Sequence, residues 1–183
     1  KIDPEFVEAL IRVEDKRFRQ HHGTDWTGML RAAVDSALSG RIVSGGSTIT
    51  MQTARMLEPR RRNIGSKLIE IVRAHQIERR LSKDEILALY LTLTPYGGNL
   101  EGVRAASWSY FGHEADRLTD DEIALLIALP QSPEARRPDR RPEQAAKARD
   151  WVAEKLAMYG VFSAEDVADV AASGVPGRRR DFP

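Results

Sequence analysis

Apolar residues recur along this chain at the three- and four-residue spacing of amphipathic helices. Phe6 and Leu10 share one helical face after the start pair Asp3-Pro4, and this helix, which is expected to carry Phe18, should break at 21–23. The same reasoning predicts further helices over 26–39, 48–59, 63–81, 82–91, 103–111, 119–129, 144–159 and 163–172. No repeat and no convincing strand-type alternation is present, so the fold class is predicted to be mainly α.

Helix-start residues support several of these boundaries. Asn63 is a good N-cap, and the segments beginning at Ser82 and Thr119 each have the Ser/Thr-x-x-Glu form of a capping box. Pro59 and Pro95 mark helix ends, and Gly97-Gly98-Asn99 predicts a tight turn.

The composition bounds the class of protein. A length of 183 residues suits one ordinary domain or two small ones, and 42% hydrophobic residues suffice for a core. Twenty-eight basic residues stand against 27 acidic ones, so the chain as a whole is not a polycation. The absence of cysteine excludes disulfides, thiolate metal sites and a cysteine nucleophile.

No stretch approaches the ~18 apolar residues of a membrane span, and there is no signal peptide. The chain opens with Lys1 and enters a helical pattern almost at once. It is therefore expected to be a piece of a longer protein, with any N-terminal membrane anchor outside these residues.

The first candidate for chemistry is the adjacent pair Glu14 and Asp15, near the end of the first helix. Neighbouring side chains on a helix point about 100° apart, so only one of the two can face a given cleft. On these two residues alone, a solvated acidic pair is the favoured interpretation. His21 is expected to be a hydrogen-bonded structural histidine, and the four histidines lack metalloprotease spacing.

Residues 45–50 read Gly-Gly-Ser-Thr-Ile-Thr, which is typical of an anion-binding turn at a helix start. A generic glycine turn is the alternative. The next segment, 55–67, holds five basic residues against Glu58 alone, a local balance of +4. Either a solvated loop or a phosphate or pyrophosphate site would account for it.

Glu70 lies one helical turn beyond Lys67, where a carboxylate beside a cation stays ionised. Two carboxylates, Glu14 and Glu70, are thus separated by an anion-binding segment. This combination favours glycosyl transfer from a phosphorylated donor over hydrolysis.

Five ordered motifs between Phe6 and Tyr159 make the chain resemble the peptidoglycan glycosyltransferase family. These are the polymerase domains of class A penicillin-binding proteins and the monofunctional transglycosylases. The matching stretches are 14–23 (Glu-Asp-x-x-Phe-x-x-His-x-Gly), 45–52 (Gly-Gly-Ser-Thr-Ile-Thr-x-Gln), 66–70 (Arg-Lys-x-x-Glu without its Arg), 83–97 and 122–133. The sequence departs from the family pattern at Met51, Ser66 and Thr92, and Met51 with the 95–98 loop most resembles the C-type penicillin-binding proteins.

The resemblance implies a lysozyme-like helical head with a smaller membrane-associating jaw. One domain would span 1–175, with the jaw at about 26–60 and a solvated linker tail at 176–183; any transpeptidase domain would lie outside this chain. Apolar residues of the expected jaw are Trp26, Met29, Leu30, Val34, Leu38, Ile42 and Val43. A place in the core is the alternative for them.

The implied activity is polymerisation of lipid II into β-1,4 glycan strands, with inversion and release of undecaprenyl pyrophosphate, at the outer, periplasmic face of the bacterial cytoplasmic membrane. Glu14 would be the general base and Glu70 the second essential carboxylate. Substrate-binding residues by the same resemblance are Asp15, Phe18, His21, Arg31, Gly46, Ser47, Thr48, Gln52, Arg55, Arg62 and Lys67.

No cofactor is required by this assignment and no metal ligand set is predicted, although Glu70 would be the residue to hold a divalent cation such as Mg²⁺ or Mn²⁺. The implied partners are lipid II, the growing strand, the membrane surface and other cell-wall synthesis proteins, and no nucleic acid.

Two other classes of function remain open from the sequence. A lysozyme-type lytic enzyme would share the helical fold and a catalytic glutamate, but it has no use for the +4 segment. A non-catalytic module that binds anionic lipid or nucleic acid would use the arginines, but it does not need Glu14.

Overall fold

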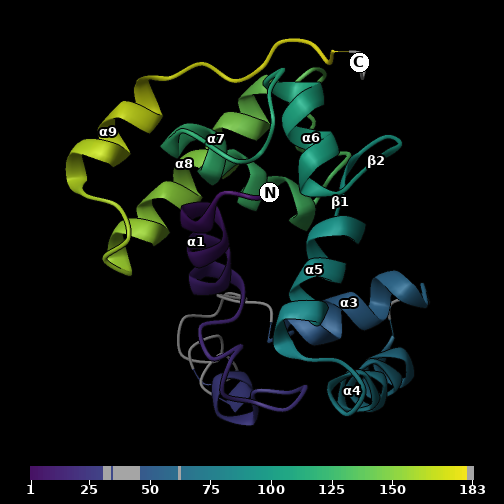
Figure 1. Ribbon diagram of the computed structural model, residues 1–183. Coiled ribbons are helices and arrows are strands. Elements are labelled where there is room, and N and C mark those ends of the chain that lie inside the picture. Colours follow the sequence, from purple (N-terminus) through teal and green to yellow (C-terminus); the bar gives the residue numbers. More distant parts are fainter. Residues whose placement is uncertain (31–33, 35–45, 62, 181–183) are drawn as a thin grey trace. The chain divides into compact units, whose positions relative to one another are not determined.

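Two compact units make up the chain in the computed structural model, which describes residues 1–30, 34, 46–61 and 63–180. The first unit comprises 1–13 and 94 onward, and the second comprises 14–93. Helices form most of the described chain, which confirms the mainly α prediction (Figure 1). The second unit covers a longer range of residues than the segment expected to be the jaw, 26–60. The sequence positions of all the predicted site residues fall within 14–93.

The first unit is built around one buried helix. Its elements are α1 (Pro4–Glu14, whose last residue begins the second unit), β1 (Pro95–Gly97), β2 (Leu100–Glu101), α6 (Val103–Tyr110), α7 (Asp120–Ala128), the 3₁₀ turn η1 (Leu129–Gln131), α8 (Pro142–Met158) and α9 (Ala164–Ala172). Residues 123–129 are all buried, because α7 packs against both α8 and α9. A helix that is apolar on every side, as this one is, belongs in a core.

The second unit is organised around α3 (Ile49–Leu57), which packs against α4 (Ile64–Glu78) and α5 (Lys83–Leu93). Residues 26–30 are also helical. The predicted cap at Asn63 is present, because its side chain accepts from the N–H of Ser66. At the start of α3, the Thr48 hydroxyl accepts from the N–H of Met51. These caps satisfy N–H groups that the first turn of a helix leaves unpaired.

Four sequence expectations need correction. The first helix ends at Glu14 and does not reach Phe18, because the chain turns there and the N–H of Phe18 donates to Asp15 O (2.9 Å). A short antiparallel hairpin, β1–β2, was not predicted; its turn uses Gly97 and Gly98, both at positive φ. Helix α4 ends three residues early, at Glu78, and α8 begins two residues early, at Pro142.

The C-terminal tail, expected to be a solvated linker, is held against α6 as far as Arg180. The N–H of Arg180 donates to Ser109 O (2.7 Å), and its guanidinium donates to Tyr110 O (2.6 Å). Arg179 donates to Asn99 Oδ1 at 3.1 Å. Within the described residues, no helix combines the length and apolar character needed to cross a bilayer.

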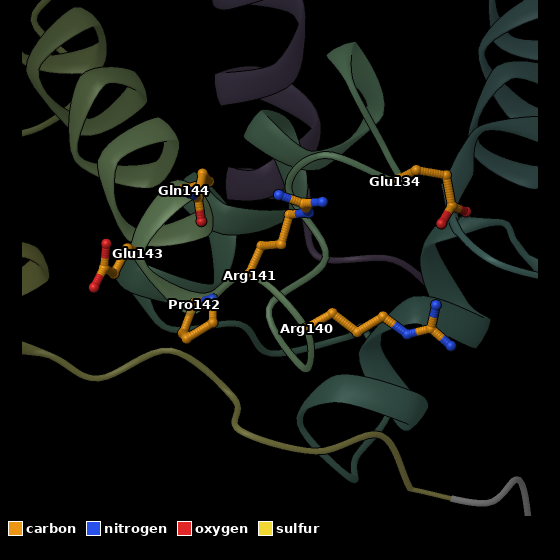
Figure 2. Close-up of a pocket in the computed structure, with 6 residues that line it drawn as sticks. All are labelled: Glu134, Arg140, Arg141, Pro142, Glu143 and Gln144. Carbon is orange, nitrogen blue, oxygen red and sulfur yellow. The ribbon is translucent and has the colours of Figure 1, made fainter.

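A shallow cavity of about 540 Å³ lies in the first unit at the start of α8. Its lining includes Glu134, Arg140 and Arg141, and the two guanidinium groups point in different directions (Figure 2). Both arginines are exposed, and none of the predicted site residues lines this cavity. The cavity is therefore separate from the predicted chemistry, which lies in the second unit.

Candidate active site

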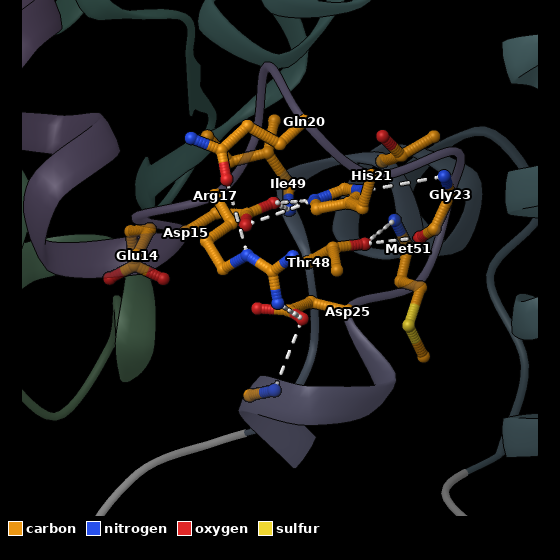
Figure 3. Close-up of polar contacts among 12 residues, drawn as sticks. Glu14, Asp15, Arg17, Gln20, His21, Gly23, Asp25, Thr48, Ile49 and Met51 are labelled. Atoms are coloured by element: carbon orange, nitrogen blue, oxygen red, sulfur yellow. Dashed lines mark hydrogen bonds and ion pairs between the residues drawn. The ribbon is translucent and has the colours of Figure 1, made fainter. Parts of the chain in front are cut away.

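A buried carboxylate joins the end of α1 to the start of α3. Asp15 accepts from His21 Nε2 at 2.9 and 3.0 Å, and its Oδ2 also accepts from the N–H of Ile49 at 2.9 Å (Figure 3). Asp15 and His21 are 6% and 7% exposed. A negative group at a helix N-terminus is favoured by the helix dipole, so Asp15 stabilises α3 where it begins.

The hydrogen bonds fix the tautomer of His21. The N–H of Gly23 donates to His21 Nδ1 (3.2 Å), so Nδ1 acts as acceptor and the ring proton lies on Nε2, facing Asp15. Thr48 completes the network, because its hydroxyl donates to Gly23 O (2.6 Å) while it accepts from the N–H of Met51. The motif at 14–23 and the start of α3 are thus locked together.

Gly23 occupies a position that suits only glycine. Its φ is +103°, and a Cβ at this site would lie 3.0 Å from backbone atoms of Ala74 and His75 in α4. Beside it, Thr24 Oγ1 lies 3.1 Å from His75 Nε2. The turn at 21–24 therefore lies directly on the backbone of α4.

Asp25 and Arg17 hold the other side of this turn. Burial raises the pKa of Asp25, but hydrogen bonds from the N–H of Gly28 and the hydroxyl of Thr27, with the charge of Arg17 3.0 Å away, together lower it below its usual value. Asp25 accordingly stays ionised at the start of the helical segment 26–30, where the helix dipole favours it.

Glu14, by contrast, is half-buried, and its carboxylate points away from the Asp15–His21 pair (Figure 3). Its Oε2 accepts from Gln52 Nε2 at 3.0 Å. Gln52 lies one turn along α3 from Thr48. Two adjacent carboxylates thus have different surroundings: one is buried in a structural network, and the other is partly exposed and oriented by an amide.

Two cations, Arg55 on α3 and Lys67 on α4, lie beside Glu70. Arg55 Nη1 is 3.9 Å from Glu70 Oε1, and Lys67 Nζ is 3.5 Å from Glu70 Oε2. The ammonium of Lys67 also donates to the hydroxyl of Ser47. Glu70 is 9% exposed, and its Oε2 has no hydrogen-bond partner in the described part of the chain. Arg55 and Lys67 keep about a third of their side-chain surface exposed, so they can reach a ligand.

The donor set around Glu70 does not suit a metal ion. Its neighbours are two cations, which repel a divalent ion, and the described residues contain no group of three or more histidine, aspartate or glutamate side chains that could hold one. We therefore derive no step through a divalent cation.

The structure assigns different places to the other predicted substrate-binding residues. Asp15, Phe18, His21 and Thr48 are buried, with Phe18 fully enclosed between the His21 ring and the Lys83 ammonium, 4.5 Å from its ring centre. Each of these four residues is less than a tenth exposed, so its observed contacts are with other residues of the second unit. Gly46 has no positive φ, so no left-handed turn requires glycine there, and Arg31 and Arg62 lie outside the described residues.

Sequence reasoning missed the residues that support α3 from beneath. Thr50 Oγ1 donates to Glu78 Oε1, and Lys83 Nζ donates to the same oxygen, both at 2.6 Å. Arg60, one of the five basic residues of 55–67, pairs with Glu58, which also accepts from Arg73. Nothing in the sequence around Thr50 or Lys83 indicated that both would contact Glu78.

Residues 1–157 match the model of a family described as transglycosylase. The chain belongs to the transglycosylase family. The family resemblance carried by the five motifs is thereby confirmed, as is the enzyme class that it implies.

Named relatives agree with this assignment. The chain is 47% identical over 168 residues to penicillin-binding protein 1C of Escherichia coli, covering 92% of this chain and 22% of that protein. It is 40% identical to penicillin-binding protein 1A of the same organism (89% and 19% covered), and 37% identical to a shorter protein of Cupriavidus necator, of which it covers 71%. The higher identity to the 1C protein supports the predicted C-type likeness.

A solved structure shows the same fold. The crystal structure of penicillin-binding protein 1A from Haemophilus influenzae superposes with a TM-score of 0.51 at 23% identity, over 73% of this chain and 17% of that one. The chain thus spans about a fifth of the length of the penicillin-binding proteins that it matches.

Proposed function

We propose that this transglycosylase-family chain polymerises lipid II. The 4-hydroxyl of an acceptor GlcNAc would attack the anomeric carbon of a donor MurNAc; an O–C bond forms on one face as the bond to pyrophosphate breaks on the other. Undecaprenyl pyrophosphate leaves with the electron pair, and the configuration inverts. The observation that carries the proposal is that α3 connects a half-buried carboxylate, Glu14 through Gln52, with the cations Arg55 and Lys67.

Glu14 is the general base in this proposal. It is the accessible member of the Glu14–Asp15 pair, and Gln52 limits the directions in which its carboxylate can point. An alcohol is a poor nucleophile, and a positioned base contributes roughly 10²–10⁴-fold by removing its proton in the transition state.

Arg55 and Lys67 would receive the leaving group. Negative charge accumulates on pyrophosphate as the glycosidic bond breaks, so charges held in place beforehand lower the barrier. Glu70 keeps Arg55 and Lys67 close together, and the Ser47 hydroxyl holds Lys67 from the other side. Glu70 is thereby a positioning carboxylate for the pyrophosphate site.

Exposed apolar residues support work at a membrane surface, facing the periplasm. Trp26, Leu30 and Val34 are 60%, 67% and 48% exposed, which argues against the core alternative for them. Helix α4 presents a second apolar stripe at Ile64 and Leu68, 84% and 60% exposed. Amphipathic surfaces of this kind bind reversibly at the lipid interface, and the substrate carries a polyprenyl tail.

The proposal is tested by incubating the chain with lipid II and separating the products on a gel. We expect polymer from the unmodified chain and a loss of at least about 100-fold in rate for Glu14→Gln, which retains an acceptor for Gln52 but cannot take up a proton. The matched control is Glu8→Gln, an exposed carboxylate on the same helix, which should leave the rate unchanged.

Cleaved glycan in place of polymer would identify a lytic enzyme, and binding without any product would identify a lipid-binding module. A Glu14→Gln variant that retains more than a tenth of the rate would contradict the general-base assignment.

A further inference from the structure

A lysine of α8 holds the last turn of α1, within the first unit. Lys155 Nζ donates to the carbonyl oxygen of Val13 at 3.2 Å. That carbonyl belongs to the peptide group whose N–H is that of Glu14, so the lysine holds the peptide plane immediately before the proposed base. None of the five sequence motifs includes Lys155.

This contact supplies a hydrogen-bond donor at the C-terminal end of α1. The last four carbonyls of a helix have no intrahelical donor, and a cation is favoured there by the helix dipole. Because α1 ends at Glu14 and the chain turns at Asp15, the Val13 carbonyl lies within the last turn. An ammonium donor from another helix satisfies this carbonyl and fixes where the turn begins.

Lys155 is itself held in position. Its ammonium lies 5.0 Å from the ring centre of Trp151, one turn before it on α8, and 5.9 Å from that of Tyr159, the residue that follows α8. Both rings present a face to the cation, an arrangement that attracts it electrostatically. The side chain is only partly exposed, so a flexible surface lysine does not describe it.

The geometry points to Lys155 as a positioning residue for glycosyl transfer, acting through the main chain of Glu14. The inference rests on the proposed function. Gln52 orients the carboxylate of Glu14, and Lys155 orients the peptide group that precedes this residue. A base must lie within hydrogen-bonding reach of the hydroxyl, and a displacement of about 1 Å can cost on the order of 10²-fold in rate.

The test compares steady-state polymerisation by Lys155→Met, Lys155→Arg and the matched control Lys147→Met, an exposed lysine of the same helix. Methionine keeps much of the aliphatic contact with the two rings but cannot donate. We expect kcat to fall roughly 10- to 100-fold in Lys155→Met with KM for lipid II changed less than about threefold. Arginine, which can still donate, should retain most of the rate.

A double substitution separates positioning from a general effect on folding. If Lys155 acts through Glu14, then Lys155→Met should cause little further loss when Glu14 is already Gln. An equal fractional loss in both backgrounds would overturn the inference, as would an unchanged kcat in Lys155→Met. An unmodified chain that makes no polymer would instead refute the proposed function, so the two failures are distinguishable.

Chemical rescue covers the case in which Lys155→Met does not fold. The chain contains no cysteine, so a Lys155→Cys variant can be alkylated at that site alone. Treatment with 2-bromoethylamine creates an ammonium at nearly the length of lysine and should restore kcat, whereas iodoethane, which adds a neutral group with no N–H donor, should restore it much less. Equal rates after both treatments would show that the charge is not needed and would overturn the inference.

Discussion

Replacing Asp15 with Asn tests whether the motif at 14–23 acts through a buried network. The change is nearly isosteric and removes one negative charge from a site that is 6% exposed. The amide oxygen can still accept from the N–H of Ile49, but the amide nitrogen then faces the protonated Nε2 of His21. His21 cannot switch tautomer without turning a second N–H against that of Gly23.

The expected loss follows from these contacts. Two opposed buried donors cost about 1–3 kcal/mol, and losing the charge at the start of α3 costs about 0.3–1 kcal/mol more. Weakening the bond from Ile49 adds a further fraction, so we expect the variant to be about 2–4 kcal/mol less stable. With a urea m-value of about 2 kcal/mol/M, the unfolding midpoint should fall by about 1–2 M.

The assay is urea unfolding followed by far-UV circular dichroism, with hydrogen exchange of α3 peptides to locate the change in the second unit. The control is Asp84→Asn, a carboxylate of the same unit whose side chain is 80% exposed and pairs with Arg19. Such a surface pair is worth less than about 1 kcal/mol. If Asp15→Asn were no more destabilising than this control, the tautomer argument would be refuted.

Three further outcomes are expected. Arg55→Ala should lower the polymerisation rate roughly ten- to a hundredfold through loss of a charge-assisted contact, whereas Arg178→Ala should change nothing; equal mild effects would indicate a diffuse basic surface. Burial, with Asp139 nearby, raises the pKa of Tyr110 to about 12 from 10.0, so the stability due to its protonated form is complete below pH 10 and is lost as the pH rises to about 12. The free energy of unfolding should fall by about 3 kcal/mol between these pH values, and the urea midpoint should fall with it; Tyr110→Phe should remove this pH dependence. Leu30→Ser and Leu68→Ser should weaken salt-sensitive binding to anionic vesicles at an unchanged melting temperature, and a drop of several degrees would show that they are core residues.

The parts of the fold that the sequence predicted are those decided by nearby residues. Thr48 and Asn63 cap helices within three residues of themselves, so the starts of α3 and α4 could be placed correctly. The hairpin β1–β2 was not predicted because its strands, of three and two residues, are too short to show an alternation of apolar and polar positions.

The end of α1 was misplaced because its cause is distant in sequence. Asp15 leaves the helix to accept from the N–H of Ile49, 34 positions away, and from His21. Helix propensity depends on residues nearby in the sequence, so it cannot predict a contact with so distant a partner. For the same reason the motif marked Asp15 and His21 as candidates for the site, but did not predict that both are buried.

The position of Gly23 on the backbone of α4 has a consequence for the history of the sequence. A Cβ at position 23 would lie 3.0 Å from main-chain atoms, and no change of rotamer can relieve that contact. This holds for alanine, serine, valine, aspartate and every other residue that a single base change can produce from a glycine codon. No substitution at this codon is therefore neutral. A second substitution nearby cannot compensate for it, because the clash is with main-chain atoms and not with a side chain. In a saturation library selected for function, position 23 should retain one amino acid.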